Sequence, residues 1–419
     1  MANSTQAIEK QNWKKDFFTI WIGQALSLLG SQLVQFALIW HITIKTGSAT
    51  VLATVAMVSM LPGVFLSPII GALVDRWNRR RIMMIADASI ALATVLLAIL
   101  FALDIAEIWH IYVLILVRSI GRNFHGPAMM ASTTLMVPNK HFTRIQGINQ
   151  TLHGGLNIIS APLGAILLEV LPMQAILSID VVTAVVAIGT LFFITIPQPE
   201  RSAEELDGKS TVWQDMIAGL KYILNWPGML IFIGSASMIN FLLTPAISLL
   251  PLLVKNHFGG QALQLGWLES ALGVGVILGG LLLGVWGGFK NRVATAMAGV
   301  IGIGIGTALM GLAPSSLFVL AIASMAIVGV MMPITNGSVG AIMQSVVDPS
   351  MQGRVFTLMG SISMAMTPIG LAFAGPLSDK FGIQIWFVFG GIFCIIMGIV
   401  GFMTPVVMNL EKSRQVENA

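Results

Sequence analysis

Long apolar runs dominate this chain and leave few folds open to it. A helix needs about 20 apolar residues to cross the hydrocarbon core of a bilayer. Runs of about that length or more occupy residues 17–42, 50–74, 82–103, 108–136, 145–168, 173–196, 228–254, 263–288, 293–312, 315–346, 355–378 and 383–408. Only 10% of the residues are charged, whereas soluble domains carry about 25%. The sequence therefore predicts an all-α membrane protein with twelve transmembrane helices.

One connection between these runs is longer and more polar than the others. It spans residues 197–227 and separates six apolar runs from six. Its polar and helix-breaking residues are Pro197, Pro199, Glu200, Arg201, Glu204, Glu205, Asp207 and Lys209. We expect an N-terminal six-helix bundle at 1–196, a cytoplasmic linker at 197–227 and a C-terminal six-helix bundle at 228–419.

The distribution of basic residues predicts the orientation in the membrane. Cytoplasmic connections of membrane proteins carry an excess of Lys and Arg. With the N-terminus inside, the inner connections hold nearly all of them, including the arginines of residues 76–81 and Lys209. The outer loops hold only Lys45, Lys255 and Lys380. Both termini are therefore expected in the cytoplasm, and the net charge of +4 reflects topology rather than nucleic-acid binding.

Short segments repeat between the two halves at a nearly constant offset. "VPNKHFTR" at 137–144 precedes the fifth run, and "VDPSMQGR" at 347–354 precedes the eleventh. "GALVDRWNR" at 71–79 matches "GVWGGFKNR" at 284–292, where Gly288 stands in place of Asp75. Two such halves predict pseudo-symmetric six-helix bundles. This organisation is typical of transporters whose binding site lies between the halves near the middle of the membrane.

The sequence also resembles a known transporter family. "GALVDRWNRRR" at 71–81 resembles the signature loop of the major facilitator superfamily, between the second and third spans. "NWKKDFFTIWIGQALSLL", "KTGSA", "VRSIGRNFHGPA" and "GRVFTLMGSISMAMTPIGL" resemble segments of bacterial macrolide-efflux transporters. The resemblance covers the whole chain. It implies a proton-driven drug exporter in the inner (plasma) membrane of a bacterium.

The resemblance assigns a conformational role to the loop after the second run. In the family, the matching Asp and the following Arg form an inner latch between the halves that holds the outward-open state. Carried over, this latch comprises Asp75 and Arg76, and Gly71 allows close helix contact beside it. The arginines at 79–81 have a second explanation, because they can keep the loop cytoplasmic and contact anionic lipid head groups.

Several polar residues lie inside the apolar runs, where charges are rare and usually functional. Arg118, Arg122 and His125 are spaced i, i+4, i+7 and therefore share one helix face, which must face protein or a wet cavity. The resemblance implies an essential arginine in the fourth span, and Arg118 is the nearest match. His153 and Asn157 in the fifth run are further candidates for this cavity. The two histidines can carry protons near neutral pH, although a structural role is the favoured explanation for either one alone.

Two acids lie deeper in the membrane than the rest. Asp180 and Glu269 are each about seven residues inside the outer end of their run, which is roughly 10 Å at ~1.5 Å per residue. A buried carboxylate without a counter-ion tends to take up a proton, so both are proton-coupling candidates. Glu269 is the first choice and Asp180 the second. The alternative for each is a static ion pair with an arginine or a hydrogen-bonded structural acid. Asp87, near the inner end of its run, is expected to be structural.

These features favour a secondary active exporter of amphipathic drugs, macrolides first, working by alternating access. An exporter of a lipid or siderophore is the alternative within transport, and a membrane sensor without transport is the alternative outside it. We expect no enzyme, because the sequence has no H-E-x-x-H motif, no nucleophile elbow and a single cysteine. No cofactor or metal is expected. The expected partners are a small amphipathic substrate, protons and membrane lipids, with no nucleic acid, and the protein is expected to be a monomer.

Overall fold

The computed structural model describes residues 13–197, 217, 220–224, 226–348 and 351–411. These residues form helices and connecting turns and contain no β-strand, in agreement with the all-α prediction. For eight residues only the backbone is described: Ser67, Pro68, Gly71, Ala72, Asp75, Pro227, Gly353 and Arg354.

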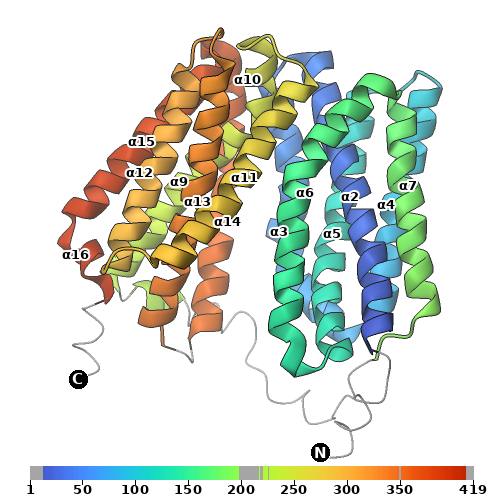
Figure 1. Ribbon diagram of the computed structural model, residues 1–419, viewed down its shortest axis with the longest axis horizontal. Coiled ribbons are helices and arrows are strands. Elements are labelled where there is room, and N and C mark those ends of the chain that lie inside the picture. The colour runs from blue at the N-terminus through green and yellow to red at the C-terminus, as the bar shows by residue number, and fades with distance from the viewer. Residues whose placement is uncertain (1–12, 198–216, 218–219, 225, 349–350, 412–419) are drawn as a thin grey trace, which may run out of the picture. The chain divides into compact units, whose positions relative to one another are not determined.

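The first six apolar runs each form one long helix (Figure 1). These are α2 (Trp13–Thr46), α3 (Ala49–Arg76), α4 (Arg79–Ala102), α5 (Ile108–Met136), α6 (Phe142–Val170) and α7 (Met173–Phe193). A short 3₁₀ turn, η1 (Asn139–His141), precedes α6. The helix α4 begins at Arg79, three residues before the predicted run 82–103. Asp87 is therefore further from the start of the helix than from the start of the run.

The last six runs form eight helices. These are α9 (Pro227–Ser248), α10 (Leu250–Asn256), α11 (Ala262–Trp286), α12 (Arg292–Leu312), α13 (Phe318–Val346), α14 (Gln352–Phe381), α15 (Ile383–Met403) and α16 (Pro405–Met408). The predicted spans 228–254 and 383–408 are each interrupted, which corrects their assignment as single helices. A proline lies in the first turn of α10 and of α16, where Pro251 and Pro405 cannot donate the hydrogen bond that would continue the preceding helix.

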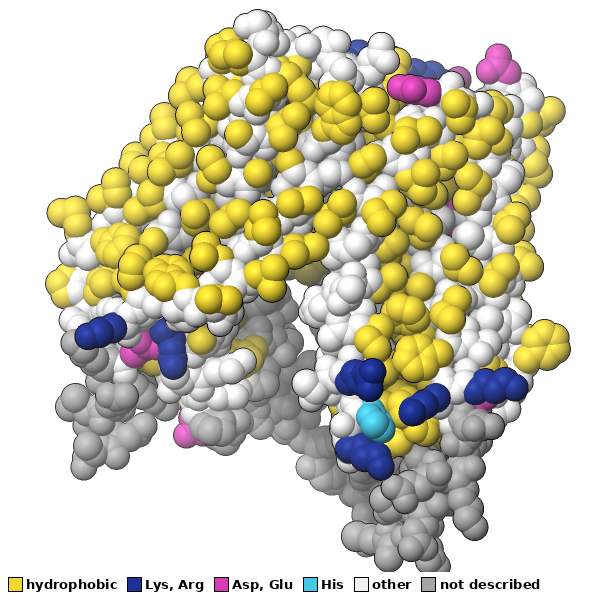
Figure 2. Space-filling model, in the orientation of Figure 1, with side chains coloured by type: hydrophobic (Ala, Val, Ile, Leu, Met, Phe, Trp, Pro, Cys, Tyr) yellow, Lys and Arg dark blue, Asp and Glu magenta, His cyan; other side chains and the backbone are white. Residues whose placement is uncertain are grey.

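Most of these helices are suited to a membrane. Among the described residues, eleven helices are long and apolar enough to cross a bilayer. The helix α5 is not one of the eleven, although it has 29 residues, and its sequence contains Arg118, Arg122 and His125. Large apolar side chains cover much of the visible surface in Figure 2, and several are almost fully exposed, such as Phe193 at 85% and Val285 at 90%. Such a surface is stable in contact with lipid.

Glycine allows close helix contacts in the second half of the chain. A Cβ added at Gly275 of α11 would lie 2.5 Å from the carbonyl oxygen of Ala326 of α13. One added at Gly306 of α12 would lie 2.9 Å from the carbonyl oxygen of Ser324 of α13. Small residues at helix interfaces are characteristic of membrane bundles, where close packing replaces the hydrophobic effect. The glycine-rich runs therefore serve packing.

The two halves begin equivalent helices in the same way. The side chain of Asn78 caps α4 by accepting a hydrogen bond from the backbone N–H of Arg81 at 3.1 Å. The side chain of Asn291 caps α12 by accepting one from the backbone N–H of Val293 at 2.9 Å. Capping satisfies backbone donors that have no partner within the helix. The matched segments 71–79 and 284–292 thus share a structural role at their final Asn-Arg pair.

The contacts within the chain define two compact units. Among the described residues, the first unit comprises residues 13–41 and 58–197. The second unit comprises residues 42–57 and the described residues from 217 onward. The described helices are α4 to α7 in the first unit and α9 to α16 in the second. The helices α2 and α3 are each divided, because the ends that adjoin their connecting turn belong to the second unit.

Candidate functional site

A large cavity lies within the first unit, between α2, α4, α5 and α6. Its volume is about 890 Å³, within the range of roughly 300–1,000 Å³ found for small-molecule sites. Its wall is mainly apolar, and the larger apolar side chains are Trp21, Leu28, Ile90, Met129, Met130, Phe142 and Ile145. A cavity of this size and composition can accommodate a bulky amphipathic molecule.

The polar face predicted for α5 contributes to this cavity. Arg118, Arg122 and His125 all line it, so the three side chains lie on the face of α5 that borders the cavity. Arg118 is buried, whereas Arg122 is exposed to the cavity. Arg122 makes no hydrogen bond or ion pair with any residue that the structure describes. The cavity therefore has one arginine that is free to interact with a ligand.

Arg118 is held by Asp180. The guanidinium group of Arg118 forms an ion pair with the carboxylate of Asp180 on α7, and both side chains are almost fully buried. Arg118 also donates to the backbone carbonyl of Ser31 at 3.0 Å. The Asp180 carboxylate accepts further hydrogen bonds from the hydroxyls of Ser31 at 2.9 Å and Thr94 at 3.2 Å. This network joins α2, α4, α5 and α7 and supports the static-ion-pair alternative for Asp180.

Asp87 is a second acid in the cavity wall. Its side chain is 6% exposed, and its Oδ2 accepts a hydrogen bond from Nε2 of Gln24 on α2 at 3.1 Å. Its Oδ1 lies 3.5 Å from Nε2 of His125 on α5. This separation exceeds the usual hydrogen-bond range of about 2.7–3.2 Å. Asp87 is therefore a cavity residue with a loosely held histidine beside it.

Helix α6 closes another part of the cavity. His153 lines it, as expected, whereas Asn157 is exposed and is not one of the lining residues. Asn149 of α6 accepts a hydrogen bond from the indole N–H of Trp21 on α2 at 2.7 Å. This contact fixes the position of a large aromatic side chain in the cavity wall.

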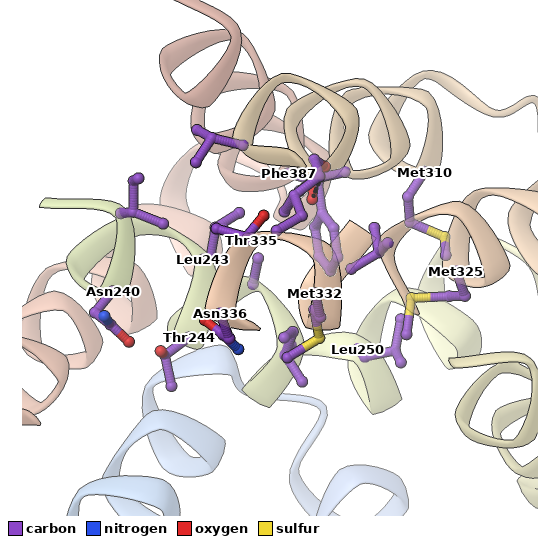
Figure 3. Close-up of a pocket in the computed structure, with 17 residues that line it drawn as sticks. Asn240, Leu243, Thr244, Leu250, Met310, Met325, Met332, Thr335, Asn336 and Phe387 are labelled. Carbon is purple, nitrogen blue, oxygen red and sulfur yellow. Dashed lines mark hydrogen bonds between the residues drawn. The ribbon is translucent and has the colours of Figure 1, made fainter. Parts of the chain in front are cut away.

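The second unit contains a smaller pocket of about 170 Å³ (Figure 3). Its polar groups are neutral amides and hydroxyls, among them those of Asn336 and Thr244. Met310, Met325 and Met332 supply flexible apolar surface. None of the residues that line this pocket is charged. Electrostatic recognition in the described cavities is thus confined to the first unit.

Glu269 lies on α11, in the second unit. It lines neither cavity, and it forms no hydrogen bond or ion pair with any residue that the structure describes. Its side chain is partly exposed. Glu269 is the one charged residue of α11 and is unpaired among the described residues, whereas Asp180 has an arginine partner.

The residues assigned to the inner latch are only partly described. The structure describes only the backbone of Gly71 and Asp75. Arg76 is exposed at the end of α3 and borders an apolar groove of about 620 Å³ with Trp77. In the neighbouring arginine cluster, Arg80 donates to the carbonyl oxygens of Leu191 and Phe192 at the end of α7. At least one arginine of the cluster therefore has a structural role.

Sequence reasoning did not find the full set of cavity residues. The sequence favours a structural role for Asp87 and gives no distinct signal for Gln24, Trp21 and Asn149. Their signal was weak, because a single amide in an apolar run has many structural explanations. The available indication was that Gln24 in the first span and Asp87 in the third span are polar residues flanked by small and apolar ones.

Comparisons with known proteins agree with this architecture. The family description "Major Facilitator Superfamily" matches residues 20–252 and 230–418. The chain is 34% identical to Macrolide efflux protein A of Streptococcus pyogenes over 402 residues, covering 96% of this chain and 98% of the relative. It is 26% identical to the Multidrug efflux pump Tap of Mycolicibacterium fortuitum, covering 91% of this chain and 94% of that protein.

Solved transporters share the fold at much lower identity. A crystal structure of the nucleoside transporter NupG, as its D323A mutant, has a TM-score of 0.72 at 13% identity, covering 93% of this chain and 99% of that one. A bacterial homologue of the iron transporter ferroportin has a TM-score of 0.70 at 13% identity, covering 93% of this chain and 99% of that one. The chain belongs to the Major Facilitator Superfamily and is of its macrolide-efflux type.

Proposed function

We propose that this protein exports amphipathic drugs, macrolides first, and is driven by the proton gradient through alternating access of its two bundles. The observation that carries the proposal is the cavity of about 890 Å³ in the first unit, with an apolar wall and both signs of charge. A bulky drug with a basic amine needs such a combination, because its body must be desolvated while its charge finds a counter-ion. The identity of 34% to a macrolide efflux protein supports the same substrate class.

Glu269 is the proposed carrier of the coupling proton. It has no partner among the described residues, whereas Asp180 is paired with Arg118. A carboxyl group without a counter-ion can be neutral in one conformation and charged in another, as the water around it changes. A carboxylate paired with an arginine is harder to protonate, because the positive charge beside it favours its charged form. Asp180 therefore stays the second choice, with a structural contribution through Arg118.

The membrane topology is part of the proposal. We place the protein in the plasma membrane of a bacterium as a monomer, with both termini in the cytoplasm and its basic loops against anionic lipid. Gly71, Asp75 and Arg76 then lie at the inner face, where they latch the outward-open state. His125 and His153 border the substrate cavity, and Asn157 lies on the same helix as His153.

An exporter of a lipid or siderophore would have the same fold, and a sensor would not need a cavity of this size. Accumulation of a radiolabelled macrolide in cells separates these alternatives. Cells that express the protein should accumulate less drug than cells with an empty vector, and a protonophore should abolish the difference. Equal accumulation with and without the protein would contradict drug export. A difference that survives the protonophore would contradict proton coupling alone.

A further inference from the structure

An apolar groove with one basic end lies on the first unit, along α4 and α5. Its volume is about 620 Å³. Arg76 and Arg81 border it at the turn that joins α3 to α4, and both side chains are exposed. Among its described lining residues these two are the charged ones, so one end of the groove is positive and the remainder is uncharged. The groove is distinct from the candidate substrate cavity, because no described residue lines both.

Small residues keep the groove open between the two helices. Ala86 of α4 and Gly121 of α5 are both buried, and both line it. A Cβ added at Gly121 would lie 2.8 Å from Cδ1 of Ile90 of α4, so the two helices are in close contact at this level. Larger apolar side chains line the groove beside them, among them Ile85 and Phe124. A space lined in this way fits a narrow and flexible apolar chain.

The length of the groove matches the depth of one membrane leaflet. From Arg81 to Ser89, its α4 side extends over roughly 12 Å at ~1.5 Å per residue. The helix α4 is one of those long and apolar enough to cross a bilayer. The hydrocarbon part of one leaflet is about 15 Å thick, which is half of the ~30 Å core. The groove therefore follows most of one leaflet.

The basic end of the groove is suited to a phosphate group. A guanidinium group presents paired N–H donors that match phosphate oxygens. The backbone N–H of Arg81 donates to the side chain of Asn78, but the side chain of Arg81 forms no hydrogen bond or ion pair with any described residue. Arg80 differs, because its side chain donates to backbone carbonyl oxygens at the end of α7. Arg81 can therefore bind an anion at the end of the groove.

Trp77 is a further residue of this end that favours a lipid. Its side chain lines the groove at the same turn and is 54% exposed. Tryptophan is enriched where a membrane protein meets the head groups, because its ring is apolar and its N–H is polar. Trp77 therefore supports a position of the arginine end at head-group level, with the apolar part of the groove in the hydrocarbon.

A second copy of the chain is a less suitable occupant. Copies in one membrane have the same orientation, so the same helices of a neighbour would bring their own arginines to the same depth. Two positive turns repel each other, whereas an anionic head group is attracted. Another groove of this unit, of about 470 Å³ between α4 and α7, has no charged residue among its described lining residues. A basic end is therefore specific to the groove along α4 and α5.

We propose that this groove binds one anionic phospholipid, with the phosphate on Arg81 and an acyl chain between α4 and α5. Basic pockets between transmembrane helices are suited to anionic head groups. Such a site goes beyond the general attraction of basic loops to an anionic membrane surface, which requires no groove. In the proposed topology, the lipid belongs to the inner leaflet. The lipid site and drug export are independent of each other.

Native mass spectrometry of the purified full-length protein tests the site by counting retained lipids. The protein is offered equal amounts of phosphatidylglycerol and phosphatidylcholine with the same acyl chains. The wild-type protein should retain one phosphatidylglycerol at least about fivefold more often than one phosphatidylcholine, because the choline cation would lie against the arginines. This comparison requires no variant.

Arg81→Gln tests the head-group end. It should lower the retention of phosphatidylglycerol at least about fivefold, because the side chain loses its charge. Arg144→Gln is the matched control, since Arg144 is an exposed arginine at the start of α6 that does not line the groove. It should stay within about twofold of wild type. Equal losses in the two variants would overturn the site, because they would indicate general attraction to basic residues.

Ser89→Phe tests the acyl-chain end without any change of charge. The larger side chain should occupy the groove and lower the retention of phosphatidylglycerol at least about fivefold. Ser178→Phe, in the uncharged groove between α4 and α7, is the matched control and should stay within about twofold of wild type. Each serine hydroxyl donates to a backbone carbonyl of its own helix at 2.8 Å, so both changes remove the same kind of hydrogen bond. Unchanged retention in Ser89→Phe, or equal loss in Ser178→Phe, would overturn the groove as the acyl site.

Inorganic phosphate separates a lipid site from a site for a free anion. At the same concentration as the lipid, phosphate should leave phosphatidylglycerol bound, because it has no acyl chain to fill the groove. Displacement of the lipid by phosphate would overturn the lipid assignment. Equal retention of phosphatidylglycerol and phosphatidylcholine by the wild-type protein would also overturn it. A dimer that retains no lipid would assign the groove to a second copy instead.

Thermal unfolding in detergent provides a second measurement on the same proteins. A ligand that binds only the folded state stabilises it. Phosphatidylglycerol should therefore raise the unfolding temperature of the wild-type protein and of Arg144→Gln more than that of Arg81→Gln. Equal increases in all three would overturn the role of Arg81. No drug enters these experiments, so failure of the lipid site would leave the proposed export intact.

Discussion

Arg118 of α5 and Asp180 of α7 form an ion pair in which neither side chain has more than 2% of its surface exposed. The pair is completed by the hydroxyls of Ser31 and Thr94, so that α2, α4, α5 and α7 meet at one polar point. Such a buried pair contributes little net stability when intact, but removal of one partner leaves an uncompensated charge. Asp180 is therefore a determinant of bundle structure.

Removal of Arg118 should destabilise the protein. Arg118→Leu leaves Asp180 buried without a counter-ion, which we expect to cost about 3–5 kcal/mol in stability. Thermal unfolding in detergent, followed by size-exclusion chromatography, measures this loss. The double variant Arg118→Leu with Asp180→Leu should recover much of the lost stability, because no charge then remains unpaired. A single variant that is as stable as wild type would contradict the structural role of the pair.

Glu269→Gln should abolish proton-driven drug efflux while the amount of protein in the membrane stays normal. The amide cannot exchange a proton, and Glu269 forms no hydrogen bond or ion pair with any described residue that the change would break. Efflux in inverted vesicles with an imposed pH gradient is the measurement. Asp180→Asn is the comparison. It should lose efflux mainly because the protein is less stable once Arg118 lacks its buried carboxylate partner. Wild-type gradient-dependent efflux in both variants would show that neither carboxyl group carries the coupling proton, and His125 and His153 would become the candidates.

The predicted topology can be read from chemical labelling. Cysteines placed at Lys45 and Lys255 should react with an impermeant reagent from outside the cell, and those at Arg79 and Lys209 only from inside. Cys394 is fully buried and is replaced by alanine to remove background. Lys209 lies outside the described residues, so labelling there also tests the linker directly. If the cysteines at positions 79 and 209 were both labelled from outside, the predicted orientation would be contradicted.

Asp75→Asn should shift the resting population toward the inward-open state. The change removes a charge that the inner latch is proposed to use in the outward-open state, and it leaves the side-chain volume unchanged. A spin-label pair at Trp77→Cys and Phe289→Cys should then report longer inner distances. Arg79→Gln is a useful comparison, since it changes charge in the same loop. Unchanged distances together with unchanged transport would leave Asp75 without a role in switching.

The sequence alone determined the features that depend on local patterns. Apolar run length predicted the helices, because spanning a bilayer sets a minimum number of residues. The i, i+4, i+7 spacing placed Arg118, Arg122 and His125 on one face of α5, because helix geometry fixes that relation. The repeat of "GALVDRWNR" at 71–79 as "GVWGGFKNR" at 284–292 indicated two related halves, because similar segments recur between equivalent runs. Each of these inferences requires no knowledge of which helices are neighbours.

Only the tertiary structure decided which polar groups meet. The partner of Arg118 lies 62 residues away on α7, and the contacts of Asp87 come from α2 and α5. Asp379 caps α3 over a separation of 330 residues in sequence. Such pairs depend on helix packing angles and depths, which are set by many small side-chain contacts across the bundle. Hydropathy and periodicity describe one helix at a time, so they leave these relationships open.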